Sequence, residues 1–221
     1  YGMTENFAYS HSTPVGDSVP GTVGRANPAV ECVIRDIGEV LVRSPTTMVG
    51  YYKAPEITAE TLTEDGFLRT GDQGRIDQDG RLHITGRVKE LFKTSKGKYV
   101  APAPIENRLL ANSLIEQVCV TGANLPQPIA VLNLNDVAQS EIASADSVKA
   151  IANELAAHLD TLNQTLDPHE RLSCLIAVPE RWTPENGFTT PTLKIKRNVI
   201  DETYAEHYEA WSTQGAKVIF K

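Results

Sequence analysis

The chain has 221 residues, of which 41% are hydrophobic and 22% are charged, a composition typical of one or two globular domains. The formal net charge of −7 argues against a nucleic-acid-binding protein, which usually carries a basic face. Three cysteines without Cys-x-x-Cys spacing predict free thiols in a cytoplasmic protein, and the five histidines lack the spacing of a zinc site.

Residues 1–86 are rich in strand and turn signals. The runs 31–35 and 38–43 are β-branched and partly alternating, with a turn expected around Ile37. Asp79-Gly80 stands between two further alternating runs, which is a strong hairpin signal. A short helix is expected to begin near Pro55, because proline is tolerated in the first helical turn. We therefore expect an antiparallel, barrel-like β unit.

Beyond residue 86 helical and strand patterns alternate. Apolar residues recur at steps of three and four from Val148 to Leu166, which predicts a long helix ended by Asp167-Pro168. Two further helices are expected to begin at Pro104 and Asn198, with strands over residues 116–120, 129–134 and 172–178. The whole chain is predicted to be α+β, with a small C-terminal domain that has a roughly three-stranded sheet and flanking helices.

Two polar clusters lie in the first third of the chain. In Tyr1-Gly2-Met3-Thr4-Glu5 a hydroxyl and a carboxylate stand together, which suits a phosphate and its Mg²⁺, an ion that prefers oxygen ligands. In Arg69-Thr70-Gly71-Asp72 the carboxylate can accept hydrogen bonds from two neighbouring hydroxyls, as on a ribose. Taken alone, the first cluster also fits a loop with a helix cap, and the second an Asx-type turn.

Two basic clusters lie further along. Gly86-Arg87-Val88-Lys89-Glu90-Leu91-Phe92-Lys93, continuing to Gly97-Lys98-Tyr99-Val100-Ala101-Pro102, combines glycines with groups that suit an anionic ligand. Thr189-Thr190-Pro191-Thr192-Leu193-Lys194-Ile195-Lys196-Arg197 places a lysine where it could meet developing negative charge in an active site. Each alone is also typical of a solvated basic loop or linker.

In order and spacing the four clusters resemble the adenylate-forming superfamily, which includes acyl-CoA synthetases, luciferases and peptide-synthetase adenylation domains. The resemblance covers residues 1–107 continuously and then 189–197. The stretch from Gly66 to Asn107 and the form Thr190-Pro191-Thr192-Leu193-Lys194 are most similar to long-chain fatty acyl-CoA synthetases. Such enzymes use ATP with Mg²⁺ to convert a fatty acid into acyl-AMP, and coenzyme A then displaces AMP.

The resemblance implies roles for five residues of the first part. Tyr1 would line the adenine pocket, Thr4 would contact the α-phosphate and Glu5 would hold Mg²⁺. Asp72 would bind both ribose hydroxyls, and Arg87 would contact the ribose or the phosphate edge. Residues 1–86 would form the end of a large N-terminal domain.

Residues 87–221 would be a mobile C-terminal domain with its hinge at Lys89. Lys194 would bridge the acyl carboxylate and the α-phosphate in the first step, although the family often has glycine where Leu193 stands. Gly97 would lie where the pantetheine arm of coenzyme A approaches, since glycine lets backbone come close.

The resemblance also predicts a C-terminal fragment. The chain opens at Tyr1, and no Ser/Thr/Gly-rich loop ending in lysine is found to cradle pyrophosphate. We therefore expect a missing N-terminal domain of the same protein to be a partner, and the 221 residues to be inactive alone. No apolar run is long enough to cross a membrane, while peripheral association stays open for a lipid substrate.

Two alternatives remain open. The enzyme could load a carrier protein instead of coenzyme A, or stop at acyl-AMP. The chain could also be a non-catalytic domain that binds a nucleotide or a partner, although such a protein would not need Glu5, Asp72, Arg87 and Lys194 together.

Overall fold

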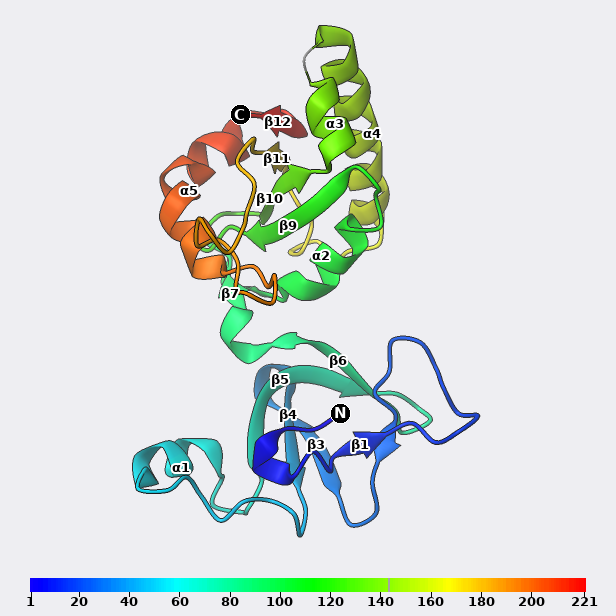
Figure 1. Cartoon of the computed structure of the whole chain (residues 1–221), viewed down its shortest axis with the longest axis vertical. Coiled ribbons are helices and arrows are strands. Elements are labelled where there is room, and N and C mark those ends of the chain that lie inside the picture. Colours follow the sequence, from blue (N-terminus) through cyan, green and yellow to red (C-terminus); the bar gives the residue numbers. More distant parts are fainter. Residues whose placement is uncertain (143) are drawn as a thin grey trace. The chain divides into compact units, whose positions relative to one another are not determined.

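The computed structural model describes residues 1–142 and 144–221, which form two compact units, Tyr1–Glu90 and Leu91–Lys221 (Figure 1). Each unit has a four-stranded sheet of its own. The α+β class expected from the sequence is therefore confirmed. That the second unit is mobile stays a prediction.

The first unit is built on an antiparallel sheet in the order β3-β4-β5-β6. Its strands are β3 (Glu31–Arg35), β4 (Glu39–Arg43), β5 (Leu68–Ile76) and β6 (Leu82–Arg87). Within the described residues this sheet is not closed into a barrel, although Val23 and Gly24 continue it through backbone hydrogen bonds to Leu82 on β6. The strands are too few to curl round and pair their own edges.

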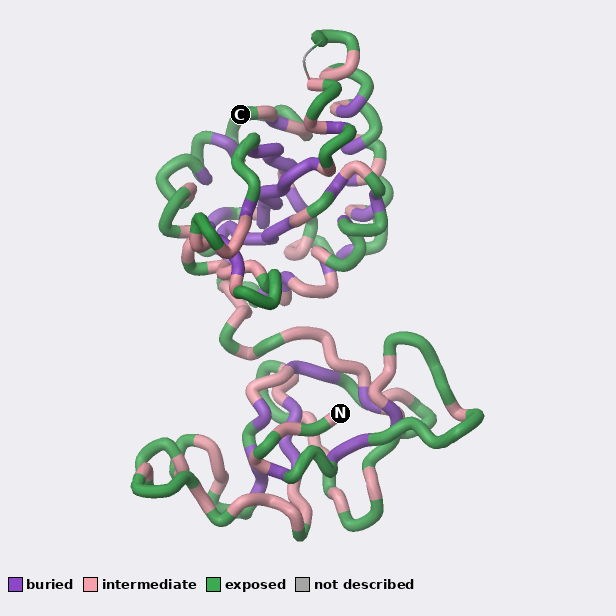
Figure 2. Tube along the Cα trace, in the orientation of Figure 1, coloured by how far each residue is buried: buried purple, intermediate pink, exposed green. Residues whose placement is uncertain are grey.

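The core of this sheet is small and lies around its central strands. Val40, Val42, Leu68 and Leu82 are almost fully buried, and Tyr1 and Met3 pack against them. The Asp-Gly hairpin is confirmed by the antiparallel pairing of β5 and β6. In its turn the Asp77 carboxylate accepts the backbone N–H groups of Asp79 and Arg81. The most buried residues of this core lie on the strands, and residues of the loops such as Tyr1 and Met3 cover it (Figure 2).

Short elements surround that sheet. The 3₁₀ helix η1 (Thr4–Asn6) precedes the two-stranded sheet of β1 (His11–Ser12) and β2 (Arg25–Ala26). The helix α1 (Pro55–Thr61) begins with proline as predicted, and two 3₁₀ turns, η2 (Asp36–Gly38) and η3 (Val88–Glu90), complete the unit.

The second unit has a mixed sheet in the order β12-β11-β10-β9. Strands β9 (Ile115–Thr121) and β10 (Ile129–Leu134) are antiparallel, whereas β11 (Leu175–Ala177) and β12 (Val218–Phe220) continue parallel to β10. The prediction of about three strands omitted β12, a three-residue apolar run near the end of the chain. Such a short run becomes a strand only because β11 offers it an edge.

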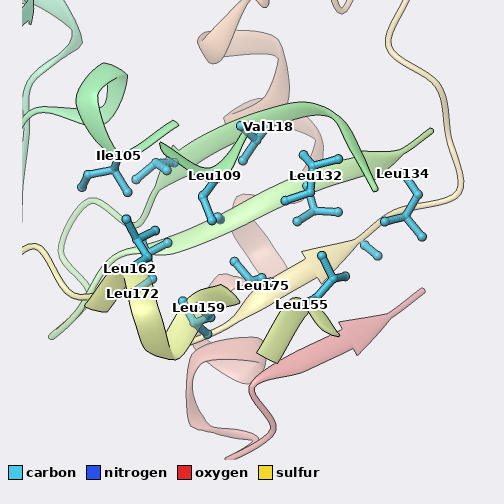
Figure 3. Packing of buried hydrophobic residues seen from close by; sticks show 14 of the residues in the cluster. Ile105, Leu109, Val118, Leu132, Leu134, Leu155, Leu159, Leu162, Leu172 and Leu175 are labelled. Atoms are coloured by element: carbon cyan, nitrogen blue, oxygen red, sulfur yellow. The ribbon is translucent and has the colours of Figure 1, made fainter. Parts of the chain in front are cut away.

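Helices cover both faces of this sheet (Figure 1). On one face, α2 (Pro102–Leu109) and α4 (Ala145–Gln164) pack through leucines on residues of alternating strand positions such as Val118, Val120 and Leu132 (Figure 3). On the other, α5 (Arg197–Thr213) packs Ile200, Tyr208 and Trp211 on Cys119 and Val131. Strand β10 is buried throughout because both of its faces are covered.

The remaining elements are short: the hairpin of β7 (Phe92–Lys93) and β8 (Tyr99–Val100), and α3 (Asp136–Glu141), which is capped by Asn135. Ser144 caps α4, its side chain accepting the Ser147 N–H. Among the helices described, none combines the length and apolar character needed to cross a bilayer.

Candidate functional site

Asp72 is the centre of a hydrogen-bonded group in the first unit. Its Oδ2 accepts the Tyr1 hydroxyl at 2.6 Å, and its Oδ1 lies 2.8 Å from Nε of Arg87. Only 13% of the Asp72 side chain is exposed, whereas 59% of the Arg87 side chain is. The structure thus brings together three residues that the sequence assigned to nucleotide binding, Tyr1, Asp72 and Arg87.

The register of the sheet explains why Asp72 and Arg87 are in contact. Asp72 on β5 stands directly opposite Arg87 on β6, and an irregularity follows between Gln73 and Gly74. Opposite charges on facing residues of two strands attract each other. Thr70 supports the arrangement, because its hydroxyl accepts the Asp72 N–H at 3.1 Å and donates to the Val40 carbonyl at 2.7 Å.

Burial and the adjoining carboxylate both act on Tyr1. Partial burial raises the pKa of its phenol, and the hydrogen bond to Asp72 raises this pKa further, so the hydroxyl keeps its proton at neutral pH. It therefore donates to Asp72 and fixes one oxygen of the carboxylate. Each carboxylate oxygen can accept more than one hydrogen bond, so Asp72 retains acceptor capacity for a diol.

Thr4 and Glu5 begin the turn η1. Thr4 is exposed, and Glu5 Oε1 accepts the Tyr51 hydroxyl at 2.8 Å, a contact that the sequence did not suggest. The buried Asn6 holds this turn, because its side chain accepts the Met3 N–H and its carbonyl accepts the Thr46 hydroxyl. A rigid short turn thus presents one hydroxyl and one carboxylate.

The donor set can be compared with the demands of Mg²⁺. No group of three or more acidic, histidine or cysteine side chains poised for a metal occurs in the described part of the chain. Glu5 therefore fits Mg²⁺ only in the manner of an ion that one carboxylate and substrate phosphates hold together.

Lys194 lies at the end of a tight hairpin in the second unit. The Thr190 N–H donates to the Lys194 carbonyl at 2.8 Å, and the Lys194 N–H donates to the Thr190 hydroxyl at 3.1 Å. Leu193 has φ of 61°, the left-handed region that favours glycine, and its side chain is 69% exposed. The loop is held by its own backbone, and the lysine is exposed to solvent.

The base of this hairpin is anchored in the core. Phe188 is 5% exposed and stacks on Trp182 with ring centroids 6.3 Å apart. The Lys196 N–H donates to the Phe188 carbonyl at 2.8 Å, which closes the loop, and Arg197 follows as the first residue of α5. The exposed lysine is therefore carried by a well-anchored base.

The other two predicted residues occupy turns. Lys89 is the middle residue of η3, next to the division between the units at Glu90 and Leu91. Gly97 lies in the hairpin between β7 and β8 with φ of 77°, and a Cβ there would be 3.8 Å from Lys93 Cε. Glycine is thus required for the backbone conformation and not for lack of space.

A cavity of about 790 Å³ lies in the second unit beside that hairpin. Ser95 contributes to its wall, together with Asn124 of the turn after β9 and with Asp201 and Tyr208 of α5. Asp201 Oδ1 accepts the hydroxyls of Thr121 and Tyr208 at 2.7 and 2.9 Å. The cavity wall is therefore partly organised by an internal hydrogen-bond network.

Sequence reasoning missed the ion pair between Glu106 and Arg197. Two parallel contacts of 2.7 Å join the guanidinium to both carboxylate oxygens. Glu106 stands in the quoted stretch from Gly66 to Asn107, and Arg197 ends the fourth cluster, but 91 residues separate them. The only sequence signal was a glutamate placed between Ile105 and Leu109, two residues of α2 that the fold buries.

Comparison with known proteins adds to this geometry. The sequence profile of the AMP-binding enzyme C-terminal domain matches residues 89–213, more than half of the chain. The chain belongs to that family. The match begins at the residue predicted as the hinge and includes the Lys194 hairpin.

Relatives of this AMP-binding enzyme C-terminal domain agree with that assignment. The long-chain-fatty-acid–CoA ligase FadD15 of Mycobacterium bovis is 36% identical over 95% of this chain and 37% of its own length. The peroxisomal long chain acyl-CoA synthetase 7 of Arabidopsis thaliana is 32% identical over 93% of this chain and 33% of its own length. The chain thus spans about a third of the length of these relatives.

A solved structure shows the same arrangement of secondary structure. The ATP-bound RpMatB-BxBclM chimera B1 matches with a TM-score of 0.71 and 31% identity, over 94% of this chain and 41% of that one. The resemblance to adenylate-forming enzymes, predicted from the sequence, is therefore confirmed. The roles of single residues stay predictions.

Proposed function

We propose that this chain is the C-terminal part of an ATP-dependent long-chain fatty acid–CoA ligase. The observation that carries the proposal is the Asp72 carboxylate, fixed between Tyr1 and Arg87 with acceptor capacity left over. Its support in sequence is the similarity of nearly the whole chain to ligases of this kind.

In the first half-reaction, a fatty acid carboxylate oxygen attacks the α-phosphorus of ATP. The bond between the α-phosphorus and its bridging oxygen breaks, and pyrophosphate leaves. Asp72 binds the ribose hydroxyls, Arg87 lies at the ribose or phosphate edge, and Thr4 contacts the α-phosphate. Lys194 joins the acyl carboxylate to the α-phosphate, where its positive charge stabilises the negative charge that develops.

Mg²⁺ accompanies the nucleotide. When bound, it would neutralise phosphate charge, and Glu5 is the residue of this chain that would hold it. The Tyr51 hydroxyl donates to Glu5 Oε1 and restricts the carboxylate to one orientation. An ion held in this way would position the phosphates of ATP before the fatty acid carboxylate attacks.

In the second half-reaction, the sulfur of coenzyme A attacks the acyl carbonyl and AMP leaves, which gives the thioester. Gly97 offers a turn without a side chain to the pantetheine arm, and Lys89 allows the second unit to rotate between the two steps. A few residues that absorb a large backbone change are the usual basis of hinge motion.

The decisive experiment uses the complete enzyme that carries this chain, with ATP, Mg²⁺, a long-chain fatty acid and coenzyme A. We expect AMP, pyrophosphate and acyl-CoA in equal amounts, measured by chromatography. Production of ADP and phosphate, or no product at all, would contradict the proposal. Replacing coenzyme A by a phosphopantetheinylated carrier protein tests the acceptor, and a thioester formed only on the carrier would favour the alternative.

A further inference from the structure

The ion pair of Glu106 and Arg197 joins three elements of the second unit. Glu106 lies on α2, Arg197 opens α5, and both engage the backbone of Val120 on β9. The Val120 N–H donates to Glu106 Oε1 at 2.7 Å, and the Val120 carbonyl accepts from Arg197 at 3.0 Å. One carboxylate and one guanidinium thus satisfy both polar groups of a single residue on an edge strand.

This pair is shielded enough from water to act as a strong link. The side chains of Glu106 and Arg197 are 12% and 23% exposed. A bidentate contact between arginine and a carboxylate fixes orientation as well as distance. A lysine at position 197 could not reproduce it, because an ammonium group is a point charge without the planar fork.

The link bears directly on Lys194. Two residues, Ile195 and Lys196, separate Lys194 from Arg197. Ile195 pairs with Thr189, and the Lys196 N–H donates to the Phe188 carbonyl. The hairpin therefore has two anchors: the buried Phe188 at its start and the Arg197 side chain at its end. Because Leu193 is exposed, the tip adds no packing of its own.

We propose that Glu106 is a positioning residue for Lys194. By holding Arg197 it fixes the first turn of α5, and with it the direction in which the hairpin presents the lysine. The inference rests on the proposed function for the role of Lys194, but the mechanical link between Glu106 and the hairpin does not depend on it.

The test replaces Glu106 by glutamine, which keeps the shape and an acceptor for Val120 but removes the charge. In the complete enzyme we expect formation of acyl-AMP to fall roughly 10- to 100-fold, the size expected when a reacting group is displaced by about 1 Å. Thioester formation from supplied acyl-AMP and coenzyme A should be little changed. Arg197→Lys should act in the same direction, and Glu106→Asp should restore part of the activity.

A second readout does not need activity. Hydrogen exchange of residues 189–195, measured in the complete enzyme, should become faster in Glu106→Gln. Lys217→Ala is the matched control, because it breaks an exposed ion pair with Asp160 at 2.6 Å, one that involves neither α2, β9 nor α5. We expect this control to leave both half-reactions and the exchange of the hairpin unchanged.

The outcomes separate the two proposals. Unchanged exchange in Glu106→Gln, or equal loss of both half-reactions, would overturn the positioning role. If the unmodified enzyme formed no acyl-AMP while Glu106→Gln still loosened the hairpin, the proposed function would fail and the link would stand.

Discussion

The two regions assigned to chemistry are held in different ways. Asp72 lies on a strand, and side chains from three separate places in the first unit fix it: Tyr1, Thr70 and Arg87. Lys194 is exposed on a hairpin that its own backbone closes, and its anchors lie only at the base. Under the proposed function, Asp72 binds the same part of the nucleotide in both steps and gains from rigidity, whereas Lys194 acts in one step and has to be withdrawn afterwards.

The largest effect is expected at the exposed region. Lys194→Ala in the complete enzyme should lower formation of acyl-AMP by about 10²- to 10³-fold, because one charged donor to the transition state is lost. Thioester formation from supplied acyl-AMP should be spared. Trapping acyl-AMP with hydroxylamine measures the first step.

Lys196→Ala is the matched control for that variant, because it removes a lysine from the same hairpin and leaves the hydrogen bond of its backbone N–H to Phe188 in place. Comparable loss in both half-reactions of Lys194→Ala would contradict the view that this lysine acts in the first step alone.

The next effect concerns the junction between the units. Lys89→Pro fixes φ near −65° and removes one backbone donor, so rotation at this residue should be restricted. We expect one half-reaction to be blocked far more than the other when each is assayed separately. Lys89→Ala is the control, because it leaves the backbone free to rotate and should retain both half-reactions. A similar loss of both half-reactions in the proline variant would argue against a hinge at this residue.

A smaller effect is expected in the rigid region. Tyr1→Phe removes one hydrogen bond to the Asp72 carboxylate, and hydrogen bonds to charged groups are worth about 1.5–3 kcal/mol. Arg87 still contacts the other oxygen of this carboxylate, so only part of this free energy should be lost. We therefore expect the ATP affinity of the complete enzyme to fall roughly 3- to 10-fold, since about 1.4 kcal/mol corresponds to tenfold in a binding constant.

Calorimetric titration with ATP measures that change in affinity. Tyr51→Phe, which removes a hydroxyl from Glu5 instead, tests whether the effect is specific to the ribose end, because it should weaken binding only when Mg²⁺ is present. An unaltered affinity in Tyr1→Phe would show that Asp72 needs no support from this phenol.

The smallest effect concerns the hairpin tip. Leu193 adopts the left-handed conformation, which costs a residue with a Cβ about 1–2 kcal/mol. Leu193→Gly removes this strain but makes the unfolded chain more flexible, so stability should rise by less than about 1 kcal/mol. Urea denaturation measures the difference. Leu193→Ala keeps the Cβ and should not stabilise, so equal stabilisation by both variants would exclude backbone strain as the cause.

Local patterns predicted much of the fold. The spacing of apolar residues predicted α4, Pro55 predicted the start of α1, and the Asp-Gly pair predicted the hairpin between β5 and β6. Whether the first sheet closes into a barrel, and whether β12 forms, could not be predicted from local patterns. Both depend on whether a strand finds a neighbour across space, and local periodicity carries no information on that.

The residues of the candidate site could be predicted from the sequence, whereas some of their contacts could not. The resemblance carried by the four polar clusters singled out Tyr1, Thr4, Glu5, Asp72, Arg87, Lys89, Gly97 and Lys194, because the order and residue types of such motifs can be compared without a fold. The contacts of Glu5 with Tyr51 and of Glu106 with Arg197 were not visible, since 46 and 91 residues separate the partners.

The sequence by itself determined the family, the α+β class and the chemical types available to the site, because these depend on residue identity and short-range spacing. Only the tertiary structure decided that Asp72 faces Arg87 across two strands and that Glu106 holds the first residue of α5. Such pairings arise from sheet register and from packing between distant segments. Their geometry therefore exists only once the chain has folded.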